Sequence, residues 1–371
     1  RNRGRIVLKF IDEFRDPALA RTLVAQIRRE AAVREAPIRL MEFCGGHTHA
    51  IFRFGLRQML AGGVEMRSGP GCPVCVTAAR DLDRAIAMAS VDDVILATFG
   101  DMVRVPGSRD TLQDARARGA DVRIVYSPRD ALDLARNQPD RHVIFLGVGF
   151  ETTAPGIAAA LLEAEGLELP NFYVLSLHKL TPPAMRAILD AGEVSLDGIV
   201  GPGHVSSVIG SEAWTFLPEE YGMPCAVAGF EPLDLLGAIA ALVRASVEGT
   251  PGVFNTYGRS VRTEGNPVAQ RMLDDVFEVV PAAWRGFGEI PASGLALRES
   301  LRHRDAAEVF PVDVPPGEEP AGCRCGEVLR GVIDPTACGL FRRVCTPRNP
   351  VGPCMVSAEG ACAAYYKYAE S

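Results

Sequence analysis

A cysteine and a histidine stand close together where an apolar segment gives way to a predicted helix. Residues 41–49 read Met-Glu-Phe-Cys-Gly-Gly-His-Thr-His, so Cys44 and His47 lie on either side of two glycines. Glycines allow a sharp turn at this point, and the partial positive charge of a helix N-terminus favours a thiolate. We therefore predict that Cys44 and His47 form a functional site rather than inert packing.

A second cysteine motif follows in residues 69–75, which read Gly-Pro-Gly-Cys-Pro-Val-Cys. This C-x-x-C spacing lets the thiols of Cys72 and Cys75 reach one metal ion or each other, and the start of a helix lowers the pKa of the first thiol. A thioredoxin-like active site is the competing interpretation. It fits less well, because here the motif lies in a long chain that also carries a separate Cys-His segment.

Six of the ten cysteines crowd into the C-terminal part of the chain, and the last four follow the spacing C-x6-C-x8-C-x7-C. Thiolate ligation without nearby histidines is typical of an iron–sulfur cluster or of a structural zinc ion, although the compact ferredoxin spacing is absent. A cubane cluster needs four ligands, so two cysteines would be a redox-active dithiol or spectators. The six are Cys323, Cys325, Cys338, Cys345, Cys354 and Cys362.

A glycine-rich loop in residues 147–155 gives a weaker signal. Gly147 and Gly149 follow a predicted strand, as in a dinucleotide-binding loop, but Thr152 replaces the third glycine. Glu151, next to two threonines, is equally compatible with helix capping and with a loop that lines a cleft. This weak pattern is the only feature of the sequence that supports a nucleotide-dependent enzyme.

The elements that must position these residues alternate along the chain. Short apolar segments rich in β-branched residues are separated by helical stretches at residues 78–90, 155–165 and 183–191, a pattern that predicts βαβ units on a mostly parallel sheet. Parallel strands gather their carboxyl ends at one edge, so we expect Cys44 and Cys72 to lie close together. The predicted strands span residues 38–43, 94–98, 122–126, 143–146, 172–177, 198–200 and 226–228.

An internal repeat divides this region. Residues 69–72 read Gly-Pro-Gly-Cys and residues 201–204, 132 positions later, read Gly-Pro-Gly-His. At the same offset the segment around Cys44 falls on the segment around Ser176. We expect a duplication in which residues 35–140 and 141–245 form two similar Rossmann-like βαβ halves facing a cleft, with His204 in the place that Cys72 holds in the first half.

The two ends of the chain are expected to form a third unit. Asp16-Pro17 marks a helix start, and glycine and proline become frequent after residue 247. We predict that residues 1–34 and 246–371 together form the iron–sulfur domain, a loop-rich and mainly helical C-terminal part completed by the N-terminal helices.

Composition limits the possible classes of protein. A chain of 371 residues exceeds the roughly 250–300 residues of a single core. The net charge of −7 gives no basic surface for nucleic acid. Three charged residues, Glu231, Asp234 and Arg244, interrupt the most apolar segment, so we expect no membrane span. We see no export signal in residues 1–16, and ten cysteines suit metal or redox chemistry in the cytoplasm better than disulfides.

Five motifs in this order resemble the [NiFe]-hydrogenase maturation protein HypD family. They occupy residues 43–49, 69–75, 147–155, 201–204 and 345–362, so the similarity covers nearly the whole chain. The resemblance implies a scaffold on which Fe(II) receives cyanide and carbon monoxide ligands for the hydrogenase large subunit. It also implies a [4Fe–4S] cluster in the C-terminal domain, which argues against zinc. The positions that match functional positions of the family are Cys44, His47, Cys72, Cys75, His204 and Glu359.

The resemblance implies partners as well. A small chaperone, HypC, would share the iron near the mouth of the cleft, and HypE, with HypF, would supply cyanide. In this interpretation Cys44 and Cys72 provide thiolates to the iron, and His47 donates a hydrogen bond to a cyanide nitrogen or a thiolate. Cys75 acts mainly as the redox partner of Cys72, although it can stand in as a ligand.

Two choices remain open in the sequence. For the cluster we expect Cys338, Cys345, Cys354 and Cys362 to be ligands and Cys323 to matter less. The alternative function is a thiol–disulfide oxidoreductase in which Cys72 and Cys75 act on a substrate protein and the cluster only feeds electrons.

Overall fold

Two parallel β-sheets form the frame of the protein in a computed structural model that describes residues 12–369. The first sheet has the strand order β2-β1-β7-β8-β9 and the second has the order β4-β3-β5-β6. The first contains β1 (Ile38–Glu42), β2 (Val64–Ser68), β7 (Gly198–Pro202), β8 (Cys225–Ala228) and β9 (Val253–Asn255). The second contains β3 (Val94–Thr98), β4 (Asp121–Ile124), β5 (His142–Gly147) and β6 (Phe172–Ser176).

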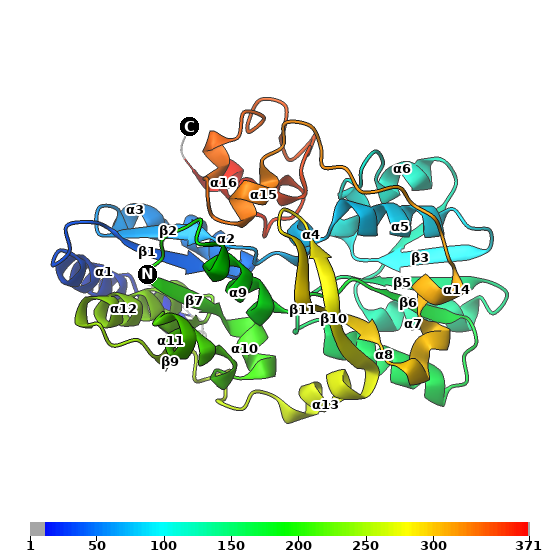
Figure 1. Ribbon diagram of the computed structural model, residues 1–371, viewed down its shortest axis with the longest axis horizontal. Helices are drawn as coiled ribbons and strands as arrows, with labels where there is room; N and C mark the ends of the chain where they lie inside the picture. Colours follow the sequence, from blue (N-terminus) through cyan, green and yellow to red (C-terminus); the bar gives the residue numbers. More distant parts are fainter. Residues whose placement is uncertain (1–11, 370–371) are drawn as a thin grey trace, which may run out of the picture.

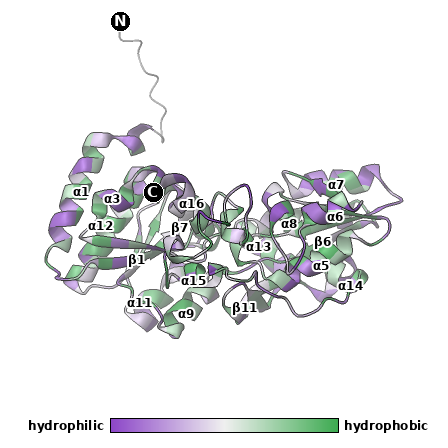
Figure 2. Ribbon diagram, turned by 90° about the horizontal axis from the view of Figure 1, so that it is seen from above, coloured by the Kyte–Doolittle hydropathy of each residue, from purple (hydrophilic) through white to green (hydrophobic). Residues whose placement is uncertain are grey.

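Helices cover both sheets, and an antiparallel hairpin of β10 (Phe277–Trp284) and β11 (Gly288–Leu297) stands between them (Figure 1). In Figure 2, α1 and α7 carry both hydrophilic and hydrophobic residues, as expected for helices with one face on a core. The first eight helices are α1 (Pro17–Ala31), α2 (Gly45–Arg53), α3 (Leu56–Leu60), α4 (Pro73–Val76), α5 (Ala79–Ala89), α6 (Leu112–Ala117), α7 (Pro128–Asn137) and α8 (Ala154–Gly166). The others are α9 (Thr181–Ala191), α10 (Gly203–Ile209), α11 (Phe216–Tyr221), α12 (Pro232–Glu248), α13 (Pro267–Val276), α14 (Ala306–Val309), α15 (Cys325–Leu329) and α16 (Ala361–Tyr368).

The α/β class with parallel sheets is confirmed, but the sheets do not follow the predicted halves. β1 and β2 pair with each other, and β1 pairs on its other side with β7, so residues 38–68 and 198–255 share one sheet. The chain leaves this sheet after β2, builds the whole second sheet from residues 94–176, and returns. Boundaries at 35–140 and 141–245 are therefore wrong, because the main neighbours of β1 come from both sides of residue 140.

The internal repeat has a different meaning from the one expected. Its two Gly-Pro-Gly segments follow β2 and β7, which flank β1 in the same sheet. The counterpart of β1 at the same offset is β6, which belongs to the other sheet. The segments around Cys72 and His204 therefore lie on one sheet edge, on either side of the segment that follows β1, rather than in two similar halves.

The N-terminal helix packs away from the C-terminal cysteines. Helix α1 begins at Pro17 as predicted, with the Asp16 carboxylate capping it, and its buried residue Ile27 packs in one core with Leu235 and Ile239 of α12. Figure 1 shows α1 beside α12 and far from α15 and α16. The expectation that residues 1–34 complete the iron–sulfur domain is wrong for residues 12–34, and residues 1–11 lie outside the described part.

A buried arginine fastens the hairpin to the rest of the molecule. Arg285 is 1% exposed; it donates hydrogen bonds to the carbonyl oxygens of Thr77 (2.8 Å) and Pro106 (3.0 Å) and pairs with Glu319 (2.6 Å). Thr77 directly follows helix α4, so this anchor holds the C-x-x-C segment against the hairpin.

Between residues 12 and 369, no helix combines the length and the apolar character that crossing a bilayer requires.

Candidate functional site

Loops from neighbouring strands meet at the carboxyl edge of the first sheet. Cys44 follows β1 and Cys72 lies in the loop after β2, and the two strands pair in parallel from Ile38 to Glu42. The Gly45 N–H donates to the Gly71 carbonyl at 2.9 Å. A Cβ atom at Gly71 would lie 2.2 Å from the Cys44 nitrogen, so only glycine permits this approach. The predicted meeting of the Cys44 and Cys72 loops is confirmed.

Cys44 is half-buried at the N-terminus of α2, and its thiol keeps its proton at neutral pH. Burial raises the pKa of Cys44 to about 12, and the carboxylates of Glu359 and Glu42 raise it further. The N–H groups of His47 and Gly46 act in the opposite direction but are outweighed. Burial therefore outweighs the effect of the helix N-terminus on the pKa of Cys44, and a bound cation would lower this pKa again.

This protonation state can be measured by alkylation. In the metal-free chain we expect the reaction of Cys44 with iodoacetamide to accelerate about tenfold per pH unit from pH 7 to 9.5, because the thiolate fraction is still far from saturation. Peptide mapping by mass spectrometry isolates Cys44 from the other cysteines, and N-acetylcysteine serves as the ordinary thiol. A Cys44 rate that levels off together with this control would contradict the raised pKa.

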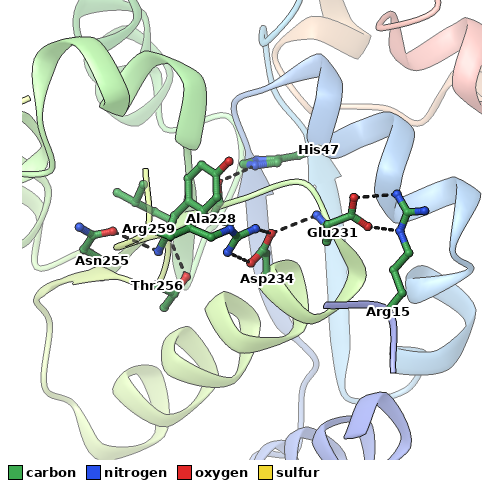
Figure 3. A network of polar contacts seen from close by, with 10 residues as sticks. Arg15, His47, Ala228, Glu231, Asp234, Asn255, Thr256 and Arg259 are labelled. Carbon is green, nitrogen blue, oxygen red and sulfur yellow. Dashed lines mark hydrogen bonds and ion pairs between the residues drawn. The ribbon is translucent and has the colours of Figure 1, made fainter. Parts of the chain in front are cut away.

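His47 is fully buried and has one nitrogen in use. Its Nε2–H donates to the Ala228 carbonyl at 3.1 Å, and Nδ1 has no partner within the described residues (Figure 3). Burial lowers the pKa of His47 to about 4, so the ring is neutral and Nδ1 is an acceptor. We predicted that His47 donates a hydrogen bond to a cyanide nitrogen or a thiolate. The neutral ring has one N–H group, and this group already donates to the Ala228 carbonyl.

His204 joins the same site through an aromatic contact. The exposed His204 ring stacks on Phe230 with 3.9 Å between the centroids, and Phe230 lies 4.9 Å from the His47 ring. His204 follows β7 and Phe230 follows β8, so four neighbouring strands contribute to one edge. The structure thus brings His204 close to His47, on the same sheet edge.

A polar network holds the turn that carries Ala228 and Phe230 (Figure 3). Arg259 donates two hydrogen bonds of 2.6 Å to the buried carboxylate of Asp234, which also accepts from the Glu231 N–H at 3.2 Å. A Cβ at Gly229 would lie 2.3 Å from Asp234 Oδ2, so the turn fits tightly around this carboxylate. Asp234 therefore helps to fix the position of the Ala228 carbonyl, which accepts the hydrogen bond from His47.

We expect the Asp234→Ala variant to lose about 3 kcal/mol of unfolding free energy, because a largely buried ion pair and the N-terminal cap of α12 disappear together. Urea denaturation followed by circular dichroism measures the loss. The matched control is Arg118→Ala, which breaks an exposed pair with Asp110 and should change the free energy by less than about 0.5 kcal/mol. Equal effects of the two variants would contradict a structural role of the network.

Glu42 is a site residue that the sequence reasoning missed. This carboxyl is 1% exposed, accepts a hydrogen bond from the Cys44 N–H at 2.9 Å and also accepts one from the Thr48 hydroxyl. Burial raises the pKa of Glu42 to about 8. The available signal was an acidic residue at the end of a mostly apolar strand, two positions before Cys44.

Glu359 reaches the site from the C-terminal segment. A Cβ at Gly45 would lie 2.4 Å from the Glu359 Cβ, so the Glu359 side chain begins directly above the start of α2. Partial burial and then the charge of Asp101 raise the pKa of Glu359. Because Asp101 follows β3, the edge of the second sheet also approaches this site.

The C-x-x-C motif lies between this site and the C-terminal cysteines. Cys75 is fully buried in α4, where burial raises the pKa of its thiol, and Cys72 is 3% exposed. The Cys75 thiol lies close enough to Cys72 on one side and Cys354 on the other for each to shift its pKa. A continuous row of thiols therefore leads from Cys72 through Cys75 to Cys354.

The six C-terminal cysteines, from Cys323 to Cys362, line one small pocket. The sulfur atoms of Cys325 and Cys354 are 2.8 Å apart, and all six cysteines are free. A hydrogen bond with Cys325 and burial raise the pKa of Cys323. Within residues 12–369, no three His, Cys, Asp or Glu side chains surround a position for a single metal ion. The pocket wall between the thiols is apolar and includes Val328, Leu340 and Phe341.

The glycine-rich loop after β5 has a packing explanation. A Cβ at Gly149 would lie 2.4 Å from Thr153, and a Cβ at Gly147 would lie 2.9 Å from the His178 ring. Glu151 is buried and accepts hydrogen bonds from the Thr181 N–H (2.7 Å) and hydroxyl (2.8 Å). It therefore caps α9, and burial raises its pKa to about 7.

Comparisons with known proteins agree along nearly the whole chain. Residues 18–369 match the HypD family model, described as the hydrogenase formation hypA family. The hydrogenase maturation factor HypD of Rhodobacter capsulatus is 49% identical over 370 residues, which cover 97% of this chain and 98% of that protein. The HypD of Azotobacter vinelandii is 50% identical over 368 residues, covering 97% of each chain. That of Escherichia coli K12 is 45% identical over 367 residues, covering 97% and 98%.

Proposed function

Because this chain belongs to the HypD family, we propose that it is a scaffold in hydrogenase maturation that holds an iron ion while the ion receives cyanide and carbon monoxide. The observation that carries the proposal is the meeting of the Cys44 and Cys72 loops beside the unused acceptor nitrogen of His47. The iron is the substrate of this site, and the completed group passes to the large subunit of a [NiFe]-hydrogenase.

In this proposal Cys44 and Cys72 provide the thiolates. Iron with cyanide and carbonyl ligands is soft, and soft metals prefer sulfur. Both thiols lose their protons when they bind iron, so iron binding releases protons to solvent. Cys44 is half-buried and Cys72 is 3% exposed, which leaves the Cys44 side of the iron open to a second protein.

His47 would act as an acceptor in the same site. With Nε2–H bonded to Ala228, Nδ1 can receive a hydrogen bond from a thiol or a partner N–H, or bind metal directly. Glu42 would hold the Cys44 backbone in place through its 2.9 Å hydrogen bond. These two groups orient the thiolates without being consumed.

We assign a resident [4Fe–4S] cluster to the pocket of C-terminal cysteines. Thiols are the usual protein ligands of such a cluster, and the apolar wall formed by Val328, Leu340 and Phe341 limits access of water. When bound, the cluster supplies single electrons at low potential. The chain itself contributes the row of thiols from Cys354 through Cys75 to Cys72, in which two thiols can close to a disulfide.

The contacts between thiols favour one division of the six cysteines. The four ligands of a cubane cluster bind different iron atoms and therefore stand apart, whereas a dithiol needs two sulfurs in contact. The sulfurs of Cys325 and Cys354 are 2.8 Å apart, whereas Cys323 lies near enough to Cys325, and Cys362 near enough to Cys354, to shift the pKa of that thiol. The division that separates all four ligands and leaves a touching pair takes Cys325 and Cys354 as the pair. The ligands are then Cys323, Cys338, Cys345 and Cys362, so Cys323 replaces Cys354 in the set expected from spacing.

The partners in this proposal are a HypC-type chaperone, which shares the iron, and HypE, which delivers cyanide made with HypF. We place the chaperone surface around Cys44 and around the open pocket of about 490 Å³ lined by Phe230, Tyr257 and Arg259. This pocket adjoins His204 through Phe230.

Anaerobic co-purification with the chaperone tests the proposal. Iron counting should find iron beyond the cluster, and infrared spectroscopy should find cyanide and carbonyl stretching bands. The alternative function, an iron–sulfur-dependent thiol–disulfide oxidoreductase, is favoured by the contact between Cys75 and Cys354. It predicts turnover on a substrate disulfide without extra iron, so a complex that lacks both the iron and the bands would overturn the scaffold proposal.

A further inference from the structure

A second polar pocket lies away from the cysteines, against the carboxyl end of β6. It has a cavity volume of about 230 Å³ and is bounded by α5, the hairpin of β10 and β11, and the start of α14. Its ionisable lining residues are Asp81, Arg84, His178, Lys179 and Asp305. The proposed iron site uses none of them, so their presence in one pocket needs a separate explanation.

Lys179 is the most unusual of these residues. Of the 39 basic residues in the chain only three are lysines, and Lys179 is 3% exposed. Its backbone is fixed, because its N–H donates to the Gly149 carbonyl at 3.0 Å and it forms a bridge with Gly294. The ammonium group approaches Asp81 at 3.6 Å, which is longer than a hydrogen bond, so its three donors lack a close acceptor among the described residues.

The Lys179 ammonium has one carboxylate partner, Asp81, at 3.6 Å, so it can still donate to a closer acceptor in the pocket. A structural lysine in an interior is expected to donate at about 2.7–3.2 Å to oxygen atoms. Burial lowers the pKa of Lys179, whereas Asp81 opposes this shift and keeps the charged form available. The ammonium is therefore held ready for an acceptor that the chain itself does not supply.

Arg84 adds a second cation on the same side of the pocket. It lies one helical turn after Asp81 in α5 and forms no ion pair within residues 12–369. The charge of Arg84 lowers the pKa of Asp305, although burial, the largest effect, raises that pKa. One carboxylate oxygen of Asp305 already accepts the Ala307 N–H at 2.8 Å. Arg84 therefore has Asp305 in electrostatic range but no direct ion pair among the described residues, so its donors can take a further acceptor.

His178 contributes a neutral ring to the wall. The Ser176 hydroxyl donates to the Leu295 carbonyl at 2.6 Å, so the 3.0 Å contact between Ser176 Oγ and His178 Nδ1 is a donation from the ring. The other nitrogen, Nε2, is then an acceptor, and it has no partner in the described chain. The pocket thus combines the cationic donors Lys179 and Arg84 with a neutral imidazole and with the carboxyl groups of Asp81 and Asp305.

We propose that this pocket binds a small oxyanion, a carboxylate or a phosphate, whose oxygen atoms accept hydrogen bonds from Lys179 and Arg84. A cationic metal is disfavoured, because no three His, Cys, Asp or Glu side chains among the described residues are placed to hold one. An apolar ligand is disfavoured as well, because it would leave the ammonium group without acceptors. The site is independent of the proposed iron chemistry.

Titration calorimetry of the full-length chain with inorganic phosphate, and separately with acetate, tests the proposal. At least one probe should bind at a single site, and the Lys179→Met and Arg84→Gln variants should each bind about tenfold or more weakly, the loss expected for one charge-assisted hydrogen bond. Lys367→Met, at an exposed lysine on α16, is the matched control and should bind normally. Binding of phosphate but not acetate, or the reverse, identifies the ligand chemistry.

A second measurement keeps the test decisive if Lys179→Met does not fold. Arg84 is only partly buried, so Arg84→Gln preserves the core, and acetylation of Lys179 should slow in the presence of the bound probe while that of Lys367 does not. The proposal is overturned if neither probe binds the intact chain, which would mean that water alone fills the pocket. It is equally overturned if Arg84→Gln and a folded Lys179→Met bind as tightly as the original chain.

Discussion

Replacing Cys44 by serine should remove the cyanide and carbonyl infrared bands from the complex with the HypC-type chaperone, with a loss of at least about tenfold, because iron loses a thiolate at the open side of the site. The geometry gives Cys44 this position: it follows β1, its backbone touches the Cys72 loop, and it is half-buried rather than enclosed. Infrared spectra of anaerobically purified complexes, normalised to protein, measure the effect.

Two other cysteines make this result interpretable. Cys75→Ser should keep most of the band intensity in a single preparation while losing repeated turnover, because the Cys75 thiol faces Cys72 and Cys354 rather than the open side. Cys225→Ala is the matched control, since Cys225 lies in β8 of the same sheet with its sulfur packed near Gly201. Bands that survive loss of Cys44, or that vanish equally in the Cys225 variant, would show that Cys44 is not an iron ligand.

The sequence predicts the meeting of Cys44 and Cys72 because the rule behind it is local. Each cysteine follows a strand, and parallel neighbouring strands end at one edge. The strand partners themselves are not local. Nothing in the residues of β1 states that β7, about 160 positions later, lies beside it, because apolar alternation fixes which face is buried but not which strand is the neighbour. The incorrect halves follow from this missing information.

The orientation of His47 shows the same limit at the level of one side chain. The sequence places a histidine at the start of α2, but the tautomer is set by the Ala228 carbonyl, 181 positions away. The sequence therefore indicates that His47 belongs to the site, and only the fold indicates that the ring accepts rather than donates. Glu42 was missed for a related reason, since its burial depends on Thr48 and on the adjacent strand β2.

Spacing along the chain also fails to divide the C-terminal cysteines. The sequence groups Cys323 with Cys325 because they are two positions apart, whereas in the fold the sulfur of Cys325 lies 2.8 Å from that of Cys354. Loops without regular structure bring distant residues together in ways that residue spacing does not encode. The cysteines that bind the cluster therefore have to be identified from contacts in the fold rather than from their spacing in the sequence.

The largest effect on the cluster itself is expected from serine variants of Cys323, Cys338, Cys345 and Cys362. Each should lose nearly all of the visible cluster absorbance and about four iron atoms per chain, because each removes one of the four cluster ligands. The same variants should open the C-terminal segment to proteolysis, since ligation in a loop-rich region also supplies its folding energy.

Serine variants of Cys325 and Cys354 should behave differently, because these two thiols touch each other and one of them contacts Cys75. They should retain about four iron atoms per chain and the cluster absorbance. What they should lose is the transfer of electrons to the Cys72 and Cys75 pair, which thiol counting after anaerobic reduction of the cluster measures. Loss of the cluster in Cys354→Ser together with its retention in Cys323→Ser would restore the ligand set expected from spacing, and the touching pair would then be an arrangement of the metal-free pocket alone.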